Sequence, residues 1–215
     1  MRILDALIGR TRPVEANLDA IFGLSGAAIT LDAAEDLEPS GEGGICYKPA
    51  AGQPFAQTAT EFRQLVSLDA EARVSESDDE YGYRWFVLQD GDFQSLVNEV
   101  HLVNTTLQEQ GYGPQLLCSV FGFRPKPSSG PAGAGAATPT PTGGAAATTP
   151  AGGAPATTFL VYLYKRGAFY PFVPLPGKER HDLEGELRLQ QVLAEDLKIE
   201  PDKERWMPIW GLPVH

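Results

Sequence analysis

The chain has 215 residues, of which 42% are hydrophobic, and its formal net charge at pH 7 is −11. Such an acidic surface repels phosphate backbones, which argues against nucleic acid as a partner. No stretch approaches the ~20 apolar residues of a membrane span, and residues 1–10 lack the uninterrupted apolar region of a secretion signal. We therefore expect a soluble, cytoplasmic protein.

Residues 2–9 predict a short amphipathic helix, in which one face carries four aliphatic side chains at helical spacing, Ile3, Leu4, Leu7 and Ile8. The same segment is basic, with Arg2, Arg10 and Arg12. A basic amphipathic helix can lie in the headgroup region of an anionic membrane. We predict a weak, salt-sensitive contact at the inner face of the plasma membrane; the alternative is that the helix packs on its own domain.

Short elements are expected next. Asn17 is a candidate N-cap for a short helix. The pattern then predicts a strand over 27–31, a helical turn over 32–37, a loop over 39–44 and a strand over 45–48.

Apolar residues at helical spacing predict two longer helices, over 54–70 and 92–110. The second is the more regular, since its apolar stripe is nearly continuous. Asp92 can cap its beginning and Gly111 suits its end.

Two strands flank this second helix. Residues 81–88 are aromatic and β-branched, which favours a strand, and residues 71–80 before them are polar and acidic. Residues 116–123 form an apolar run without charge, which is typical of a central strand.

Residues 125–157 consist almost entirely of Pro, Gly, Ala, Thr and Ser, without a charge from Ser128 to Thr157. Such a segment buries too little apolar surface to offset its conformational entropy. We therefore expect a disordered insertion. The alternative interpretation of this segment, a mucin-like stalk, would require that the protein be secreted.

Beyond the insertion, strands are predicted over 159–164 and 169–173, joined by a tight turn, and a last helix over 182–197. With 116–123 these strands make an antiparallel meander. The expected fold class is α+β, a single domain with an antiparallel sheet packed by helices on one side. The expected organisation is an N-terminal segment over 1–13, one domain over 14–124 plus 158–215, and the insertion over 125–157.

The sequence contains no nucleophile elbow, no phosphate-binding loop and no dinucleotide fingerprint. Its histidines, His101, His181 and His215, have no metal-binding spacing. We predict a non-enzymatic protein without cofactor or metal. The alternative is a small hydrolase or transferase that uses Cys118 and His101 with the acids at 78–80.

The two cysteines, Cys46 and Cys118, each lie in an apolar run, so we expect free, buried thiols. A disulfide between them would require that their strands be neighbours.

Five residues are candidate partner contacts, Lys165, Arg166, Tyr170, Trp206 and Trp210. The two cations flank an aromatic hairpin that could dock an acidic partner, and tryptophans often anchor interfaces. The alternative is structural, because aromatic strands and a C-terminal aromatic run usually close the core of their own domain.

Several sequence segments, taken together, are similar to those of a known family. They are LDALIGR from Leu4, NLDAIF from Asn17, EYGYRW from Glu80, HLVNTTL from His101, GPQLLCSVF from Gly113, LVYLYKRG from Leu160 and ERWMPIWG from Glu204. In this combination the chain resembles PspAB, the type B associated proteins of phage shock protein A found in actinobacteria. The resemblance covers nearly the whole chain except 125–157, where the family usually has a short connection.

The resemblance implies an accessory or adaptor role in the envelope stress response. It implies a PspA-like membrane-stress protein, or an envelope metalloprotease, as partner. It implies no reaction and no active site.

Overall fold

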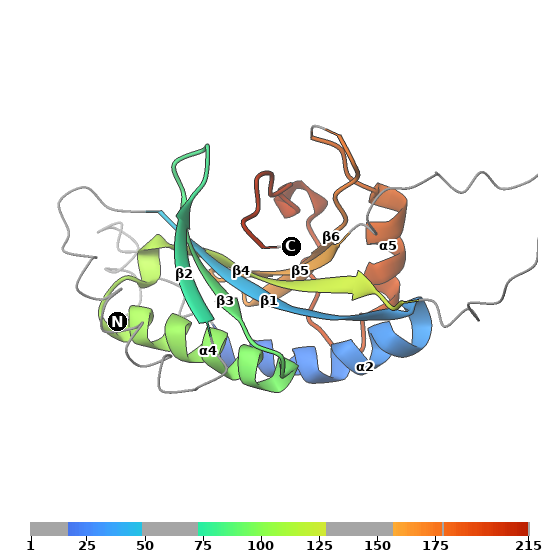
Figure 1. The fold of residues 1–215 in the computed structure, drawn as a ribbon, viewed down its shortest axis with the longest axis horizontal. Coiled ribbons are helices and arrows are strands. Elements are labelled where there is room, and N and C mark those ends of the chain that lie inside the picture. The colour runs from blue at the N-terminus through green and yellow to red at the C-terminus, as the bar shows by residue number, and fades with distance from the viewer. Residues whose placement is uncertain (1–16, 49–72, 128–156, 178, 215) are drawn as a thin grey trace, which may run out of the picture.

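The computed structural model of the chain describes residues 17–48, 73–127, 157–177 and 179–214. Its centre is one antiparallel sheet of six strands in the order β2-β3-β1-β4-β5-β6 (Figure 1). The strands are β1 (Leu37–Tyr47), β2 (Arg73–Asp78), β3 (Arg84–Gln89), β4 (Leu116–Pro125), β5 (Thr158–Leu163) and β6 (Ala168–Phe172).

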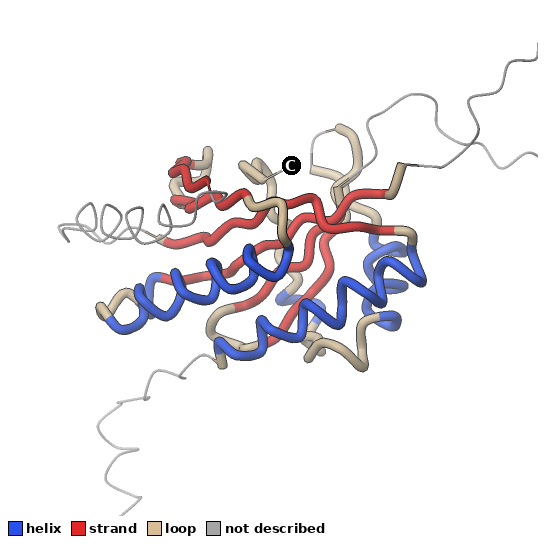
Figure 2. Tube along the Cα trace, turned by 60° about the horizontal axis from the view of Figure 1, so that its bottom comes forward, coloured by secondary structure: helices blue, strands red, loops and turns tan. Residues whose placement is uncertain are grey.

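Helices cover one face of this sheet, which we call the helix face (Figure 2). The helices of the described residues are α2 (Leu24–Glu35), α4 (Phe93–Glu109) and α5 (Leu183–Val192), with the 3-10 helices η1 (Leu18–Gly23), η2 (Gly113–Gln115) and η3 (Lys203–Arg205). Helices α2 and α4 lie under the middle of the sheet, and α5 lies at the β6 edge (Figure 1).

Helix α4 shows how sequence periodicity produces this packing. Leu96, Val100 and Val103 are fully buried against the sheet, as expected for side chains three or four positions apart on one helix face. The buried Asn104 amide donates a hydrogen bond to Ser119 Oγ on β4 at 2.9 Å, so this polar pair is satisfied inside the core. The Asp92 carboxylate accepts a hydrogen bond from the backbone N–H of Ser95 at 2.7 Å, which confirms the predicted N-cap.

The strands alternate between two hydrophobic clusters. Along β4, Val120 points to one cluster and its neighbour Phe121 to the other. The first cluster lies under the helices. The second lies on the opposite face, beneath the C-terminal segment (residues 200–214), and we call that face the tail face. Because both faces are covered, all five residues of β6 are buried.

Several predictions from the sequence are confirmed. The chain is an α+β protein with helices on one side of an antiparallel sheet. The run 116–123 belongs to the central strand β4, and β4, β5 and β6 form the predicted meander. The last helix, α5, ends at Val192 rather than at 197, and turns follow it.

The strand predicted over 27–31 was wrong, because these residues belong to α2. Ala27 and Leu31 are four positions apart and both are fully buried on the same helix face. The helix ends at Glu35, and the next residue, Asp36, has a φ of 51° in the left-handed region. The turn predicted over 32–37 is therefore the end of α2 and the beginning of β1.

The loop predicted over 39–44 was also wrong, because β1 passes through it with one irregularity between Pro39 and Gly43. Gly41 has a φ of 81°, in the left-handed region that favours glycine, whereas Gly43 and Gly44 are needed for packing. A Cβ on Gly44 would lie 3.0 Å from Val214 Cγ2 and 3.3 Å from Trp85 Cε3, so the tail face closes over this bare backbone.

The acidic segment 71–80 contains an unpredicted strand, β2, at the edge of the sheet. The helices predicted over 2–9 and 54–70 lie outside the described residues, as do residues 128–156 of the insertion. None of the helices described here is long and apolar enough to cross a membrane.

Candidate functional site

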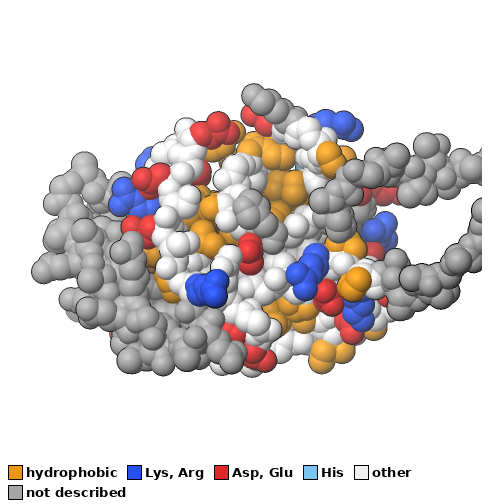
Figure 3. Space-filling view, viewed as in Figure 1, with side chains coloured by type: hydrophobic (Ala, Val, Ile, Leu, Met, Phe, Trp, Pro, Cys, Tyr) orange, Lys and Arg blue, Asp and Glu red, His pale blue; other side chains and the backbone are white. Residues whose placement is uncertain are grey.

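The C-terminal segment crosses the tail face of the sheet (Figure 1). Four of its apolar residues pack on the second hydrophobic cluster while remaining partly exposed, Trp206, Ile209, Trp210 and Leu212. Hydrophobic side chains reach the surface beside this segment (Figure 3). Partly exposed aromatic residues of this kind are typical of surfaces that bind proteins or ligands.

Tyr170 ties the segment to the sheet. Its hydroxyl donates a hydrogen bond to the backbone oxygen of Met207 at 2.7 Å, and its ring stacks on Trp206 with 6.0 Å between centroids. Burial raises the pKa of Tyr170 well above its usual value, so the hydroxyl stays protonated and donating at neutral pH.

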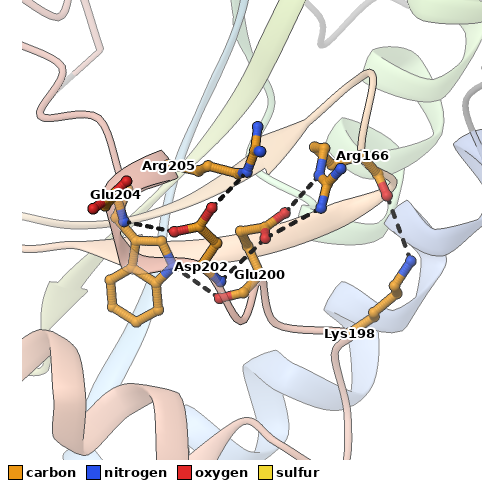
Figure 4. Close-up of polar contacts among 7 residues, drawn as sticks. Arg166, Lys198, Glu200, Asp202, Glu204 and Arg205 are labelled. Carbon is orange, nitrogen blue, oxygen red and sulfur yellow. Dashed lines mark hydrogen bonds and ion pairs between the residues drawn. The ribbon is translucent and has the colours of Figure 1, made fainter.

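A buried carboxylate, Glu200, organises the start of the segment (Figure 4). Its side chain is 1% exposed and accepts a hydrogen bond from Arg166 Nε at 2.9 Å. Its oxygens also accept the backbone N–H of Asp202 at 3.2 Å. These bonds satisfy the buried charge, and the hydrogen bond from Arg166 lowers the pKa of Glu200.

The same cluster holds Trp206 in place. The indole Nε1–H donates to the backbone oxygen of Glu200 at 2.9 Å, and Lys203 Nζ lies 3.6 Å from the ring centroid. Asp202 begins the short helix η3, where its carboxylate accepts the N–H of Glu204 and the Nε–H of Arg205. The first turn of the segment is therefore fixed by polar contacts, whereas its later part rests on apolar packing.

A pocket of about 350 Å³ opens between the later part of the segment and the residues that follow β6. Ten residues line it, Thr157, Phe159, Pro174, Leu175, Pro176, Ile209, Trp210, Gly211, Leu212 and Val214. The Trp210 ring meets Phe172 edge-on with 5.4 Å between centroids. The volume and the mainly apolar lining suit an apolar side chain or a small ligand.

His181 lies next to this pocket. Its Nδ1 is 2.9 Å from Glu186 Oε1, and its ring centroid lies 6.2 Å from that of Trp210. The buried Glu186 also accepts the backbone N–H of Val173, so it joins helix α5 to the end of β6. The pair of His181 and Glu186 therefore supports the pocket wall. The sequence analysis did not identify this pair.

The structure places four of the five candidate partner contacts at the surface, but towards opposite ends of the β5–β6 hairpin, because Trp210 contacts Phe172 and the two cations lie in the turn. Lys165 and Arg166 are exposed in the turn between β5 and β6, and Trp206 and Trp210 are half-buried in the C-terminal segment. Tyr170 is 2% exposed, so it lies beneath this surface and supports it. The sequence analysis did not identify Glu200, or Pro174 and Pro176 in the pocket wall, because their roles depend on contacts between distant segments.

The alternative catalytic pair does not come together. His101 lies on α4 at the helix face, where its Nε2 is 3.3 Å from Asp19 Oδ1. Cys118 packs against the cluster of the tail face, on the other side of the sheet. In the acidic run, Asp79 accepts the backbone N–H groups of Tyr81 and Tyr83 and therefore organises a turn. No group of three potential metal ligands occurs among the described residues.

These features define an α+β protein whose antiparallel sheet is covered by helices on one face and by its own C-terminal segment on the other. The chain belongs to the PspAB family: the family model described as PspA associated protein B matches residues 1–214. The resemblance inferred from the sequence is thereby confirmed over essentially the whole chain. No curated protein and no solved structure matches the chain significantly.

Proposed function

We propose that this chain is a non-enzymatic adaptor that binds a PspA-like protein through the region around its C-terminal segment. The observation that carries the proposal is the family match, since the family is described by its association with PspA. The role in the envelope stress response and the cytoplasmic location belong to this proposal as well.

The geometry of the C-terminal region supports an adaptor role. The pocket at Trp210 can receive an apolar side chain. The exposed cations Lys165 and Arg166 lie in the β5–β6 turn, at the other end of the β5–β6 hairpin from this pocket. Interface energy is usually concentrated in a few anchors, such as an aromatic residue at a pocket, with polar side chains around them. Arg166 is already paired with the buried Glu200, so Lys165 is the cation of this turn that favours an acidic segment of the partner.

A cross-linked pull-down with the tagged full chain, from cells under envelope stress, tests the proposal. We expect a PspA-like protein among the main captured proteins. An envelope metalloprotease captured in its place would make that enzyme the partner. Recovery of neither protein would contradict the adaptor role.

A second prediction from the sequence is a peripheral membrane contact through the basic residues Arg2, Arg10 and Arg12. A small fraction of the full chain should co-sediment with anionic vesicles, and less of it at high salt. A chain that lacks residues 2–12 should stay in solution. Equal sedimentation of the two chains would assign the segment to the fold.

A further inference from the structure

The two cysteines are opposite each other in the centre of the sheet. In the register of β1 against β4, Cys46 pairs with Cys118. Both side chains point to the tail face, where they belong to or pack against the same cluster. Directly opposed residues of antiparallel strands have Cα atoms ~4.5–5.5 Å apart, which lies within the ~4.4–6.8 Å that a disulfide spans. Both thiols are free in this structure.

The environments of the two thiols differ. Cys46 is 4% exposed, whereas Cys118 is partly exposed. The hydrogen bond with Cys118 and burial raise the pKa of the Cys46 thiol, so Cys46 stays protonated. Cys118 is therefore the thiol that an oxidant reaches first, and Cys46 is placed to react with the product.

We propose that Cys46 and Cys118 form a reversible disulfide between β1 and β4 when a hydroperoxide oxidises the chain. In the first step Cys118 loses its proton to water and the thiolate attacks an oxygen of the hydroperoxide. The O–O bond breaks, Cys118 becomes a sulfenic acid, and the leaving alkoxide or hydroxide takes up a proton to give an alcohol or water. In the second step Cys46 sulfur attacks the Cys118 sulfur and the S–O bond breaks. The hydroxide takes up the Cys46 proton and leaves as water, and a small thiol can reduce the disulfide again.

The disulfide would lie beneath the C-terminal segment, because the cysteines share their cluster with Trp206 and Trp210. It would also close a loop of roughly 70 residues, which restricts the unfolded chain. We therefore expect oxidation to raise the melting temperature by about 5–15 °C. The inference concerns the chemistry of this face and does not depend on the identity of any partner.

The test treats the full native chain with hydrogen peroxide, alkylates it under denaturing conditions and measures its mass without reductant. We expect a monomer that has lost two hydrogens and takes up no alkylating agent, and a cross-linked peptide pair that contains residues 46 and 118. In glutathione buffers, the ratio of reduced to oxidised glutathione needed to reduce the disulfide should be roughly 100- to 1,000-fold higher for the native chain than for the denatured chain.

Single variants separate the two roles. In Cys46→Ser the sulfenic acid at Cys118 has no partner, so dimedone should trap it; in Cys118→Ser the buried Cys46 should give at least ~10-fold less adduct. The proposal is overturned if wild-type chain gives only intermolecular disulfides or sulfinic acids, or if both thiols stay free. It is also overturned if the two single variants react equally with the peroxide.

Discussion

Tyr170→Phe should make local opening of the C-terminal segment more frequent without disturbing the rest of the fold. The change removes the hydroxyl that donates to the backbone oxygen of Met207 at 2.7 Å. It keeps the aromatic ring that stacks on Trp206 and fills the tail-face cluster. The effect should therefore come from one hydrogen bond and not from a cavity.

The magnitude follows from the exposure of the acceptor's residue. Met207 is 63% exposed, so water can hydrate its backbone oxygen after the change. The loss should then be the net value of an ordinary hydrogen bond, about 0.5–1.5 kcal/mol. That value corresponds to a roughly 2- to 13-fold larger equilibrium constant for local opening of the segment.

Amide hydrogen exchange measures this opening directly. The N–H of Trp206, which bonds to the backbone oxygen of Lys203 at 3.0 Å, is a suitable reporter within the segment. Tyr162→Phe is the matched control, because its hydroxyl donates to the backbone oxygen of Asn17 at 2.9 Å on the helix face. The control should speed exchange near η1 and leave Trp206 unchanged.

Unchanged exchange at Trp206 in Tyr170→Phe would refute the idea that this hydroxyl tethers the segment. Equal acceleration by both variants would also refute it, because the effect would then be a general loss of stability.

Two further predictions concern stability. Burial raises the pKa of Tyr162 to about 12, whereas an unfolded tyrosine ionises near ~10. The contribution of Tyr162 to stability should therefore be complete below pH ~10 and be lost as the pH rises towards 12. Urea unfolding midpoints measured across this range should fall less steeply for Tyr162→Phe than for the wild-type chain. If the two chains lose stability in parallel, this tyrosine does not contribute to the alkaline transition. Deletion of residues 128–156 should move the melting temperature by less than about 5 °C, because β4 and β5 pair directly up to Phe123 and Thr158 and loop closure depends weakly on length. A larger decrease in a scanning calorimeter would mean that the segment contributes to the fold.

The sequence was sufficient where hydrophobic patterns are long. Helix α4 carries a continuous apolar stripe over 17 residues, and residues 116–123 of β4 form an uncharged apolar run, so both were predicted with little error. These signals are local, because each element shows in its own residues which side is buried.

It was insufficient where distant contacts decide the structure. Residues 39–44 suggest a loop, yet Gly43 and Gly44 lie inside β1. A Cβ on Gly44 would lie 3.0 Å from Val214 Cγ2, and a Cβ on Gly43 would lie 3.4 Å from Leu96 Cδ1, so distant side chains need this space. Strand β2 is polar because it lies at an edge of the sheet, so it has no apolar alternation to detect. Tertiary pairing thus overrides local propensity at these positions.

The same distinction applies to the candidate site. Trp206, Trp210 and the cations of the β5–β6 turn stand out in the sequence because of their chemistry. Glu200 does not, because its importance comes from burial and from Arg166, 34 positions away. The pairing of Cys46 with Cys118 likewise depends on the register of β1 and β4, which the sequence left open.

The most direct test of the account is a titration of the purified full chain with purified PspA-like protein, monitored by calorimetry. Trp210→Ala should weaken binding by roughly 30-fold or more, as expected for an anchor residue. Lys165→Glu, which reverses the charge of one exposed side chain, should weaken it by roughly 3- to 10-fold, and less at high salt.

Two controls lie away from the C-terminal segment. Arg73→Glu makes the same change of charge on the exposed edge strand β2, and Leu102→Ala removes an exposed apolar side chain from α4. All variants should keep the wild-type circular dichroism. The account predicts weaker binding for the first pair of variants and wild-type affinity for the controls; wild-type affinity for Trp210→Ala and Lys165→Glu would contradict it.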